Sequence, residues 1–194
     1  VHASRALSPE EEELAKCLDM ARRPLHAAGL IGETPEGIGY GNLSVRKADG
    51  AFLVTGTATG GLERLLPEHF ACVAECDAER NMVRSEGPSC PSSESMTHGA
   101  VYEACPEVRS VIHVHCPELF HALLEEGAPQ TPPDAAYGTP AMARAVRELA
   151  STLGAEGVFA TPGHENGVFA FGSSPELAAE RLLALFRRLG PGRK

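Results

Sequence analysis

Two histidines stand on alternate residues of a short apolar stretch, Val-Ile-His-Val-His, at residues 111–115. Alternate residues of a β-strand point to the same face of a sheet, so His113 and His115 would lie side by side. Two imidazoles that face one space suggest a metal ion. With eight histidines in 194 residues, a His-x-His pair arises by chance in about a third of such chains. The pair therefore needs support from other residues.

A third histidine and a carboxylate could complete a set of metal ligands. His164 lies in a turn-forming sequence, Thr-Pro-Gly-His-Glu-Asn-Gly, where a histidine is usually just solvated. Glu94 follows Pro-Ser-Ser at the start of a helical pattern, where the helix dipole would hold it ionised. Three histidines and one carboxylate form a four-ligand zinc set, and a carboxylate that exchanges would leave one position for a substrate.

Three loops rich in Gly, Ser, Thr and Asn could bind an anion: YGNLSVRKADG, VTGTATGGL and GPSCPSSES. Such loops can turn successive backbone N–H groups toward one point, although ordinary turns select the same residue types. The third loop leads into a helical pattern that Ser92 or Ser93 could cap. The free N–H groups of that first turn would form an anion site.

The elements that must position these residues alternate between helical and extended patterns. Residues 8–29 begin with Ser8 as an N-cap, then Pro9 and a run of acids, and they predict a helix. Further helical patterns cover 94–104, 117–126, 140–153 and 175–189, and β-like runs cover 51–54, 70–75, 108–115, 157–161 and 168–171. This order predicts an α/β domain whose sheet is mixed or antiparallel.

Composition restricts the partners and the compartment. A formal net charge of −9 disfavours binding to nucleic acid or to an anionic membrane, so an anionic small substrate would need a local pocket. The six cysteines are dispersed, with no Cys-x-x-Cys pattern, and no signal peptide is apparent, which favours reduced thiols in a cytoplasmic protein. The apolar runs are too short to span a bilayer. We expect one domain over residues 1–194.

Five motifs in this order, GNLSVR, TGTATGGL, PSSE, HVH and GHENGVFAFG, resemble those of the class II aldolase/adducin family. That family includes fuculose-phosphate aldolase and related sugar-phosphate lyases. The resemblance covers most of the chain. It implies an α/β/α layered domain with a central, mainly antiparallel sheet. It also implies a homotetramer whose active sites lie between neighbouring subunits.

The resemblance assigns roles to individual residues. It implies that His113, His115 and His164 bind Zn²⁺, or another divalent ion such as Mn²⁺ or Co²⁺. Glu94 would be a fourth ligand at rest and the catalytic acid/base when substrate displaces it. The residues implied to hold a substrate phosphate are Asn42, Thr59, Gly60, Ser92 and Ser93. Thr55-Gly56 also fits the Thr-Gly part of this pattern, but the distance to Leu-Pro-Glu-His favours Thr59-Gly60.

The implied activity is that of a metal-dependent lyase of the aldolase type. It would cleave a carbon–carbon bond of a small sugar phosphate or related hydroxy-carbonyl compound through a metal-stabilised enediolate. A decarboxylase of a 3-oxo acid phosphate would pass through the same enediolate and is the nearest alternative. A dehydratase or a sugar-phosphate 4-epimerase is another, although such epimerases resemble SSD rather than SSE. A non-catalytic adducin-like binding module is disfavoured, because such modules lack the metal histidines.

Two features depart from the family or compete with its ligand set. The segment after His115 is short and lacks the tyrosine that would protonate the aldehyde from a neighbouring subunit; Tyr137 is the nearest substitute. The sequence Tyr-Gly-Thr-Pro is, however, more typical of a cap for the following helix. His98 lies one helical turn after Glu94 and shares its face, which favours a supporting or packing role over metal binding.

Overall fold

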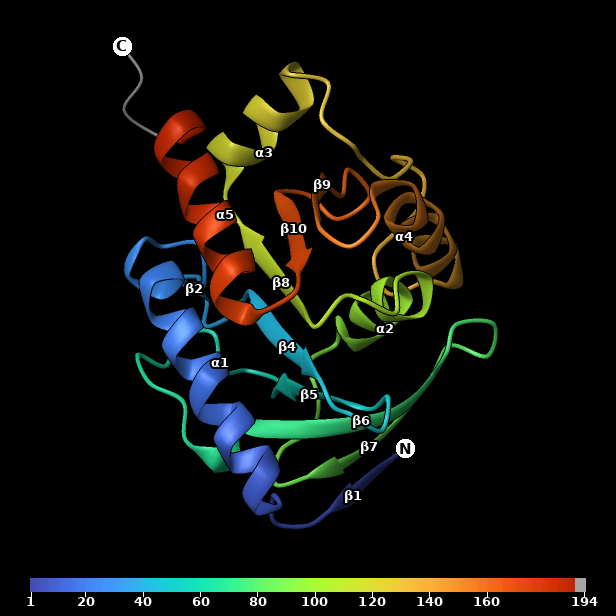
Figure 1. Cartoon of the computed structure of the whole chain (residues 1–194). Helices are drawn as coiled ribbons and strands as arrows, with labels where there is room; N and C mark the ends of the chain where they lie inside the picture. The colour runs from blue at the N-terminus through green and yellow to red at the C-terminus, as the bar shows by residue number, and fades with distance from the viewer. Residues whose placement is uncertain (191–194) are drawn as a thin grey trace.

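An eight-stranded sheet runs through the centre of the computed structural model, which describes residues 1–190 (Figure 1). The strand order is β1-β7-β6-β5-β4-β8-β10-β9, and all neighbours are antiparallel except β1 and β7. The strands are β1 (His2–Ser4), β4 (Asn42–Arg46), β5 (Phe52–Thr55), β6 (Phe70–Asp77), β7 (Met82–Gly87), β8 (Ser110–His115), β9 (Gly157–Ala160) and β10 (Gly167–Gly172). A separate pair is formed by β2 (Gly32–Glu33) and β3 (Gly39–Tyr40). The prediction of a mainly antiparallel sheet is confirmed.

Helices cover both faces of this sheet, and each face has its own apolar core (Figure 1). On one side lie α1 (Pro9–Ala27), α3 (Pro117–Glu125) and α5 (Pro175–Leu189), whose apolar residues pack with Leu53 and Ile112 of the sheet. On the other lie α2 (Ser95–Ala104) and α4 (Pro140–Leu153), which pack with Val54 and Val111. A short 3-10 helix, η1, spans Pro67–His69. The α/β/α layering implied by the family resemblance is therefore present.

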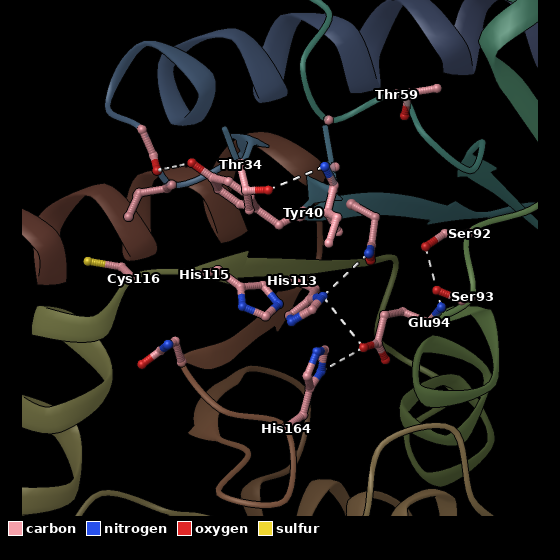
Figure 2. A pocket seen from close by; sticks show the side chains of 18 of the residues that line it. Thr34, Tyr40, Thr59, Ser92, Ser93, Glu94, His113, His115, Cys116 and His164 are labelled. Atoms are coloured by element: carbon pink, nitrogen blue, oxygen red, sulfur yellow. Dashed lines mark hydrogen bonds and ion pairs between the residues drawn. The ribbon is translucent and has the colours of Figure 1, made fainter. Parts of the chain in front are cut away.

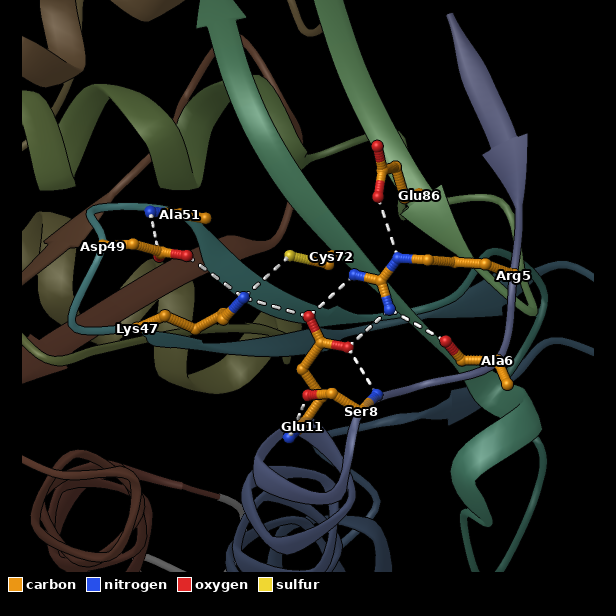
Figure 3. A network of polar contacts seen from close by, with 9 residues as sticks. All are labelled: Arg5, Ala6, Ser8, Glu11, Lys47, Asp49, Ala51, Cys72 and Glu86. Carbon is orange, nitrogen blue, oxygen red and sulfur yellow. Dashed lines mark hydrogen bonds and ion pairs between the residues drawn. The ribbon is translucent and has the colours of Figure 1, made fainter.

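The start of α1 is fixed by its predicted cap and by a buried carboxylate. Ser8 Oγ accepts a hydrogen bond from the backbone N–H of Glu11, whose own side chain accepts one from Ser8 N. The Glu11 side chain also accepts hydrogen bonds from Arg5 and Lys47 (Figure 3). It therefore connects the start of α1 with the segment after β1 and with the end of β4. Its hydrogen bonds to Arg5 hold the pKa of this carboxyl far below its ordinary value.

The segment at residues 40–50, which the sequence assigned to a loop, contains a central strand. β4 pairs with β5 on one side and with β8 on the other. Its polar residues Asn42 and Ser44 break the apolar run expected of a buried strand, but hydrogen bonds to other buried side chains satisfy them. The loop assignment is therefore wrong at Asn42–Arg46, and this strand brings Asn42 beside His113. The strands β1, β2, β3 and β7 were also not predicted.

The remaining predicted helices and strands are found at about their expected positions, each within a few residues. No helix among residues 1–190 combines the length and apolarity required to cross a membrane. All six cysteines are free thiols in the structure. The single-domain prediction for residues 1–194 extends four residues past the part that the structure describes.

Candidate active site

A cavity of about 680 Å³ opens where β8 ends, and the residues proposed for chemistry surround it (Figure 2). Its walls include the start of β4, the loop 56–60, the segment 92–94 before α2 and the turn that carries His164. These segments are far apart in the sequence. The antiparallel pairing of β8 with both β4 and β10 places them at one end of the sheet.

Three histidine side chains converge in this cavity. His113 and His115 lie at the C-terminal end of β8. Gly167, the partner of His115 in β10, follows the turn that carries His164. One nitrogen from each ring can be chosen such that all three lie within 4.8 Å of one another. The turn is held by hydrogen bonds from His164 N to Thr161 O and from Gly167 N to His164 O.

Glu94 faces the same point from the segment before α2. Its Oε1 lies 2.8 Å from Nδ1 of His164 and 3.9 Å from Nδ1 of His113 (Figure 2). Its Oε2 accepts a hydrogen bond of 2.8 Å from the hydroxyl of Thr97, one turn along α2. Glu94 is the residue that precedes the helix rather than part of its first turn. Its N–H donates to Ser92 Oγ, which orders the segment before α2. The prediction that Ser92 or Ser93 caps this helix is wrong, because Glu94 occupies the N-cap position and no side chain caps it.

The electrostatics of the cavity keep two of these imidazoles neutral. Burial lowers the pKa of His113 well below its ordinary value, and the neighbouring His115 and His164 lower it further. Burial likewise lowers the pKa of His115 to about 4, and His164 adds to this effect, while a hydrogen bond to the backbone of Glu165 opposes it. A neutral imidazole is the form that binds a metal ion.

The donor set fits a divalent metal ion. Two buried polar atoms of this set, His113 Nε2 and Glu94 Oε1, have no hydrogen-bond partner within residues 1–190. The close approach of Glu94 to His164 thus lacks the geometry of a hydrogen bond, and the carboxylate oxygen is free to act as a ligand. Three imidazole nitrogens and one carboxylate oxygen are donors that zinc accepts in tetrahedral sites.

A chain of buried hydrogen bonds supports His113 from behind. Asn42 Nδ2 lies 3.3 Å from Nδ1 of His113, and Asn42 Oδ1 accepts a bond of 2.7 Å from His98 Nε2. The other nitrogen of His98 lies 2.7 Å from Ser44 Oγ, which in turn contacts the hydroxyl of Tyr102. Burial lowers the pKa of His98 to about 3, so this ring is neutral. His98 does not line the cavity and is a supporting residue.

The residues predicted to bind phosphate all line the same cavity. Asn42, Thr59, Gly60, Ser92 and Ser93 all line the cavity, whereas Thr55, the alternative threonine, does not. The Thr59 hydroxyl donates to Gly56 O at 2.8 Å and so closes the loop 56–60. Gly60 packs so tightly that a side chain there would collide with the carbonyl oxygen of Gly32, which explains the glycine. The amide of Asn42 is already engaged with two histidines, so its role toward phosphate stays a prediction.

Tyr137, the nearest substitute for the missing family tyrosine, lies in the cavity. Thr139, rather than Tyr137, caps α4: its Oγ1 accepts from the backbone N–H of Met142 at 3.3 Å. The Tyr137 ring lies 4.5 Å from the ring of His164, centroid to centroid, and its backbone N–H donates to Gly163 O. Burial raises the pKa of this phenol, and a hydrogen bond with Ser93 opposes the shift. The sequence Tyr-Gly-Thr-Pro does cap α4, as predicted, through Thr139 at the N-cap and Pro140 at the first helical position, and Tyr137 lines the cavity as well.

The family model for the class II aldolase and adducin N-terminal domain matches residues 36–189, which include the three histidines, Glu94 and the residues predicted to bind phosphate. The chain belongs to the class II aldolase/adducin family. Members of this family generally use a divalent metal ion, in agreement with the histidine cluster described above.

Individual relatives agree with this assignment. A segment of 77 residues is 39% identical to 3-oxo-tetronate 4-phosphate decarboxylase of Haemophilus influenzae; it covers 40% of this chain and 33% of that protein. Among solved structures, YgbL of Escherichia coli, for which an aldolase, epimerase or decarboxylase activity has been suggested, has a TM-score of 0.68 and 20% identity over 92% of this chain and 87% of its own. L-fuculose 1-phosphate aldolase has a TM-score of 0.64 and 18% identity over 94% and 86%. These two likenesses show the fold.

Proposed function

We propose that this member of the class II aldolase/adducin family is a metal-dependent lyase that cleaves a carbon–carbon bond in a small phosphorylated hydroxy-carbonyl compound. The observation that carries the proposal is the convergence of His113, His115, His164 and Glu94 on one cavity. Neutral hydrogen-bond donors line the same cavity. A non-catalytic module would have no need for buried, neutral histidines with free nitrogens.

The three histidines would hold the ion, and Glu94 would be the ligand that substrate displaces. When bound, the ion would act as a Lewis acid that withdraws electron density from the substrate carbonyl. The family resemblance and the donor set support zinc, manganese or cobalt for this role. The phosphate group of the substrate would lie against Thr59, Gly60, Ser92 and Ser93, where hydroxyl and backbone N–H groups can donate to its oxygens.

Once displaced, Glu94 would move the proton at the reacting carbon. Thr97 fixes one carboxylate oxygen, so the other oxygen stays directed into the cavity. In the cleavage direction the broken bond leaves an electron pair that passes into the neighbouring carbonyl, and Glu94 then gives a proton to that carbon. In the addition direction Glu94 removes the same proton. A positioned group of this kind contributes about 10² to 10⁴ in rate.

Tyr137 would move the proton at oxygen. Its phenol lies against His164 in the same cavity, and it comes from the same chain as the metal ligands. In aldol cleavage a substrate hydroxyl must lose its proton as it becomes the aldehyde, and the Tyr137 oxygen could accept that proton as a phenolate, after its own proton has passed to solvent. In the addition direction the phenol would give the proton back to the aldehyde oxygen.

Decarboxylation of a 3-oxo acid phosphate is the second candidate, and the match to the Haemophilus influenzae decarboxylase favours it. Loss of carbon dioxide leaves the same electron pair beside a carbonyl, so Glu94 would again protonate the carbon. No substrate hydroxyl has to lose a proton in that reaction. Tyr137 is therefore required for aldol cleavage and dispensable for decarboxylation, which separates the two candidates by mutation.

The decisive experiment is a substrate screen that follows aldehyde and carbon dioxide separately. Purified protein is incubated with ketose phosphates and 3-oxo acid phosphates in the presence of Zn²⁺, Mn²⁺ or Co²⁺, and the His113→Ala variant serves as the control. Release of aldehyde, abolished in Tyr137→Phe, would support the aldolase reaction. Release of carbon dioxide, retained in Tyr137→Phe, would support the decarboxylase. No turnover by metal-loaded protein would contradict both and favour a binding module.

A homotetramer and a cytoplasmic location complete the proposal, and both come from the family resemblance and the composition. Sites between subunits would place residues of a neighbouring chain at the mouth of the cavity. Light scattering on the purified protein measures the assembly directly, and a monomer would contradict it.

A further inference from the structure

Arg22, on α1, is a buried cation directly behind the loop 56–60. Arg22 is only 1% exposed to solvent. Its Nη2 donates to the carbonyl oxygens of Thr59 at 3.1 Å and of Gly60 at 2.7 Å. Its Nη1 is buried and has no hydrogen-bond partner within residues 1–190. An arginine in this setting stays charged, because its guanidinium does not lose its proton in proteins.

No carboxylate forms an ion pair with this guanidinium among residues 1–190. Asp19, one turn earlier on α1, is the acid whose charge acts on Arg22, but its two oxygens serve other groups. Asp19 Oδ2 accepts from Arg23 at 2.9 Å, and Oδ1 accepts from Leu65 N at 2.8 Å. Burial is the larger influence on Arg22 and lowers its pKa. Burial of a charge without an ion-pair partner destabilises the fold, which suggests that this arginine has a functional role.

The contacts of Arg22 also orient the cavity wall. Thr59 and Gly60 line the cavity and Arg22 does not, so the guanidinium contacts their peptide groups from the side away from the cavity. In a trans peptide the C=O and N–H bonds point in opposite directions. The carbonyl of Thr59 is directed at Arg22, and the N–H of Gly60 is therefore directed away from it. Gly60 N lies beside Gly39, another residue of the cavity wall.

We propose that Arg22 is the positioning residue and charge source of an anion site for a phosphate monoester dianion on this wall. It turns the peptide between Thr59 and Gly60 so that an N–H faces the cavity, and its positive charge acts on the anion through that peptide. This inference rests on the proposed function, because it explains how a chain with a net charge of −9 can attract a phosphorylated substrate at this point. Ser92 and Ser93 supply hydroxyl donors, but among residues 1–190 the wall contains no cationic side chain.

Inorganic phosphate is the probe for this site, and substitutions at Arg22 separate charge from shape. Arg22→Lys and Arg22→Gln can both donate to the loop carbonyls, but only lysine keeps the charge. Arg22→Met removes both the donors and the charge, and Arg23→Met is the matched control for a neighbouring arginine that contacts Asp19 at the surface. Binding of phosphate is measured by calorimetry on metal-loaded protein, and metal content is measured for each variant.

We expect Arg22→Met and Arg22→Gln to bind phosphate about tenfold more weakly or worse, and Arg22→Lys and Arg23→Met to stay within about threefold of the wild type. With a substrate in hand, the same two weak variants should raise KM and change kcat little. Metal content should stay at the wild-type level in all of them, because Arg22 does not contact the histidines. Restoration by lysine is a result that a merely structural role would not produce.

Equal phosphate affinity in wild type and folded Arg22→Met would overturn the inference while leaving the phosphate site of the proposed function intact. If Arg22→Met does not fold, Arg22→Gln decides in its place, and affinity equal to that of Arg22→Lys would show that the charge has no role. Failure of the wild type to bind phosphate would instead remove the phosphorylated substrate from the proposed function, and this inference with it.

Discussion

The molecule buries two glutamates, and their surroundings differ in one respect. Glu11 is 1% exposed and Glu94 is 4% exposed. Both oxygens of Glu11 are occupied by Arg5, Lys47 and the backbone of Ser8, whereas Glu94 has one oxygen fixed by Thr97 and one with no hydrogen-bond donor (Figures 2 and 3). A carboxylate that is fully paired stabilises the fold. One that keeps a free oxygen in a cavity is available to a metal ion, a substrate or a proton.

The largest expected effect of this difference is on turnover. Glu94→Gln keeps the volume and one ligand oxygen but removes the group that exchanges a proton. We expect turnover to fall by about 10² to 10⁴ with the metal still bound and the melting temperature close to that of the wild type. Steady-state rates and metal content on the same preparation measure this. Wild-type turnover would remove Glu94 from the reaction.

The matched change at the paired glutamate should affect stability instead. Glu11→Gln leaves Arg5 and Lys47 without their shared anion, and Arg5 is partly exposed, so solvent screens part of the loss. We expect the free energy of unfolding to fall by about 2 to 3 kcal/mol in chemical denaturation, while turnover per folded molecule is unchanged. A variant as stable as the wild type but inactive would contradict the distinction between the two sites.

A smaller effect concerns the pH dependence of the free energy of unfolding, to which His98 beside the active site and Glu11 contribute in different pH ranges. The buried His98 has a pKa of about 3 in the folded chain against an ordinary value of 6.5, so between these values the unfolded chain binds a proton that the folded chain does not. Stability should therefore fall as pH drops below about 6.5, by up to about 1.4 kcal/mol per pH unit from this group. The lowered pKa of Glu11 acts only at lower pH, because its contribution is present above the ordinary value of 4.5 and lost as pH falls further.

Denaturation of wild type and His98→Gln between pH 5 and pH 7, in roughly half-unit steps, tests this assignment. The difference in their stabilities should narrow or reverse as pH falls, since glutamine carries no titrating group. The same pH dependence in both proteins would show that His98 is not the group that titrates. Glu11→Gln should keep the wild-type dependence in this range, which makes it the control.

Local patterns predicted the parts of the fold that depend on local chemistry. The start of α1 follows from Ser8 and the acids after it, and the adjacency of His113 and His115 follows from the two-residue period of a strand. β4 was not predicted because Asn42 and Ser44 are polar, and only their hydrogen bonds to residues distant in the sequence make them suitable for a central strand. The proximity of His164 to this pair depends on the β8–β10 pairing, which spacing alone does not reveal.

Two residues of the site depended wholly on long-range contacts. Tyr137 reaches the cavity because its backbone N–H donates to Gly163 O, and the sequence near it favours a helix cap, which Thr139 provides, over a role in the site. Arg22 stands next to Arg23 on a helix, a pair that ordinarily indicates a solvated face. Its burial follows from the contact with the loop 56–60, and the sequence carries no signal of that contact.

The central claim is that three histidines and Glu94 form a metal centre, and the metal content of the purified protein tests it most directly. After loading with zinc and removal of excess, elemental analysis should give roughly one ion per chain for the wild type, as expected of a single four-ligand site. His113→Ala, His115→Ala and His164→Ala should each lose that ion while keeping a folded circular dichroism spectrum. Full retention of zinc in any two of these variants, or a wild type that binds none, would contradict the account.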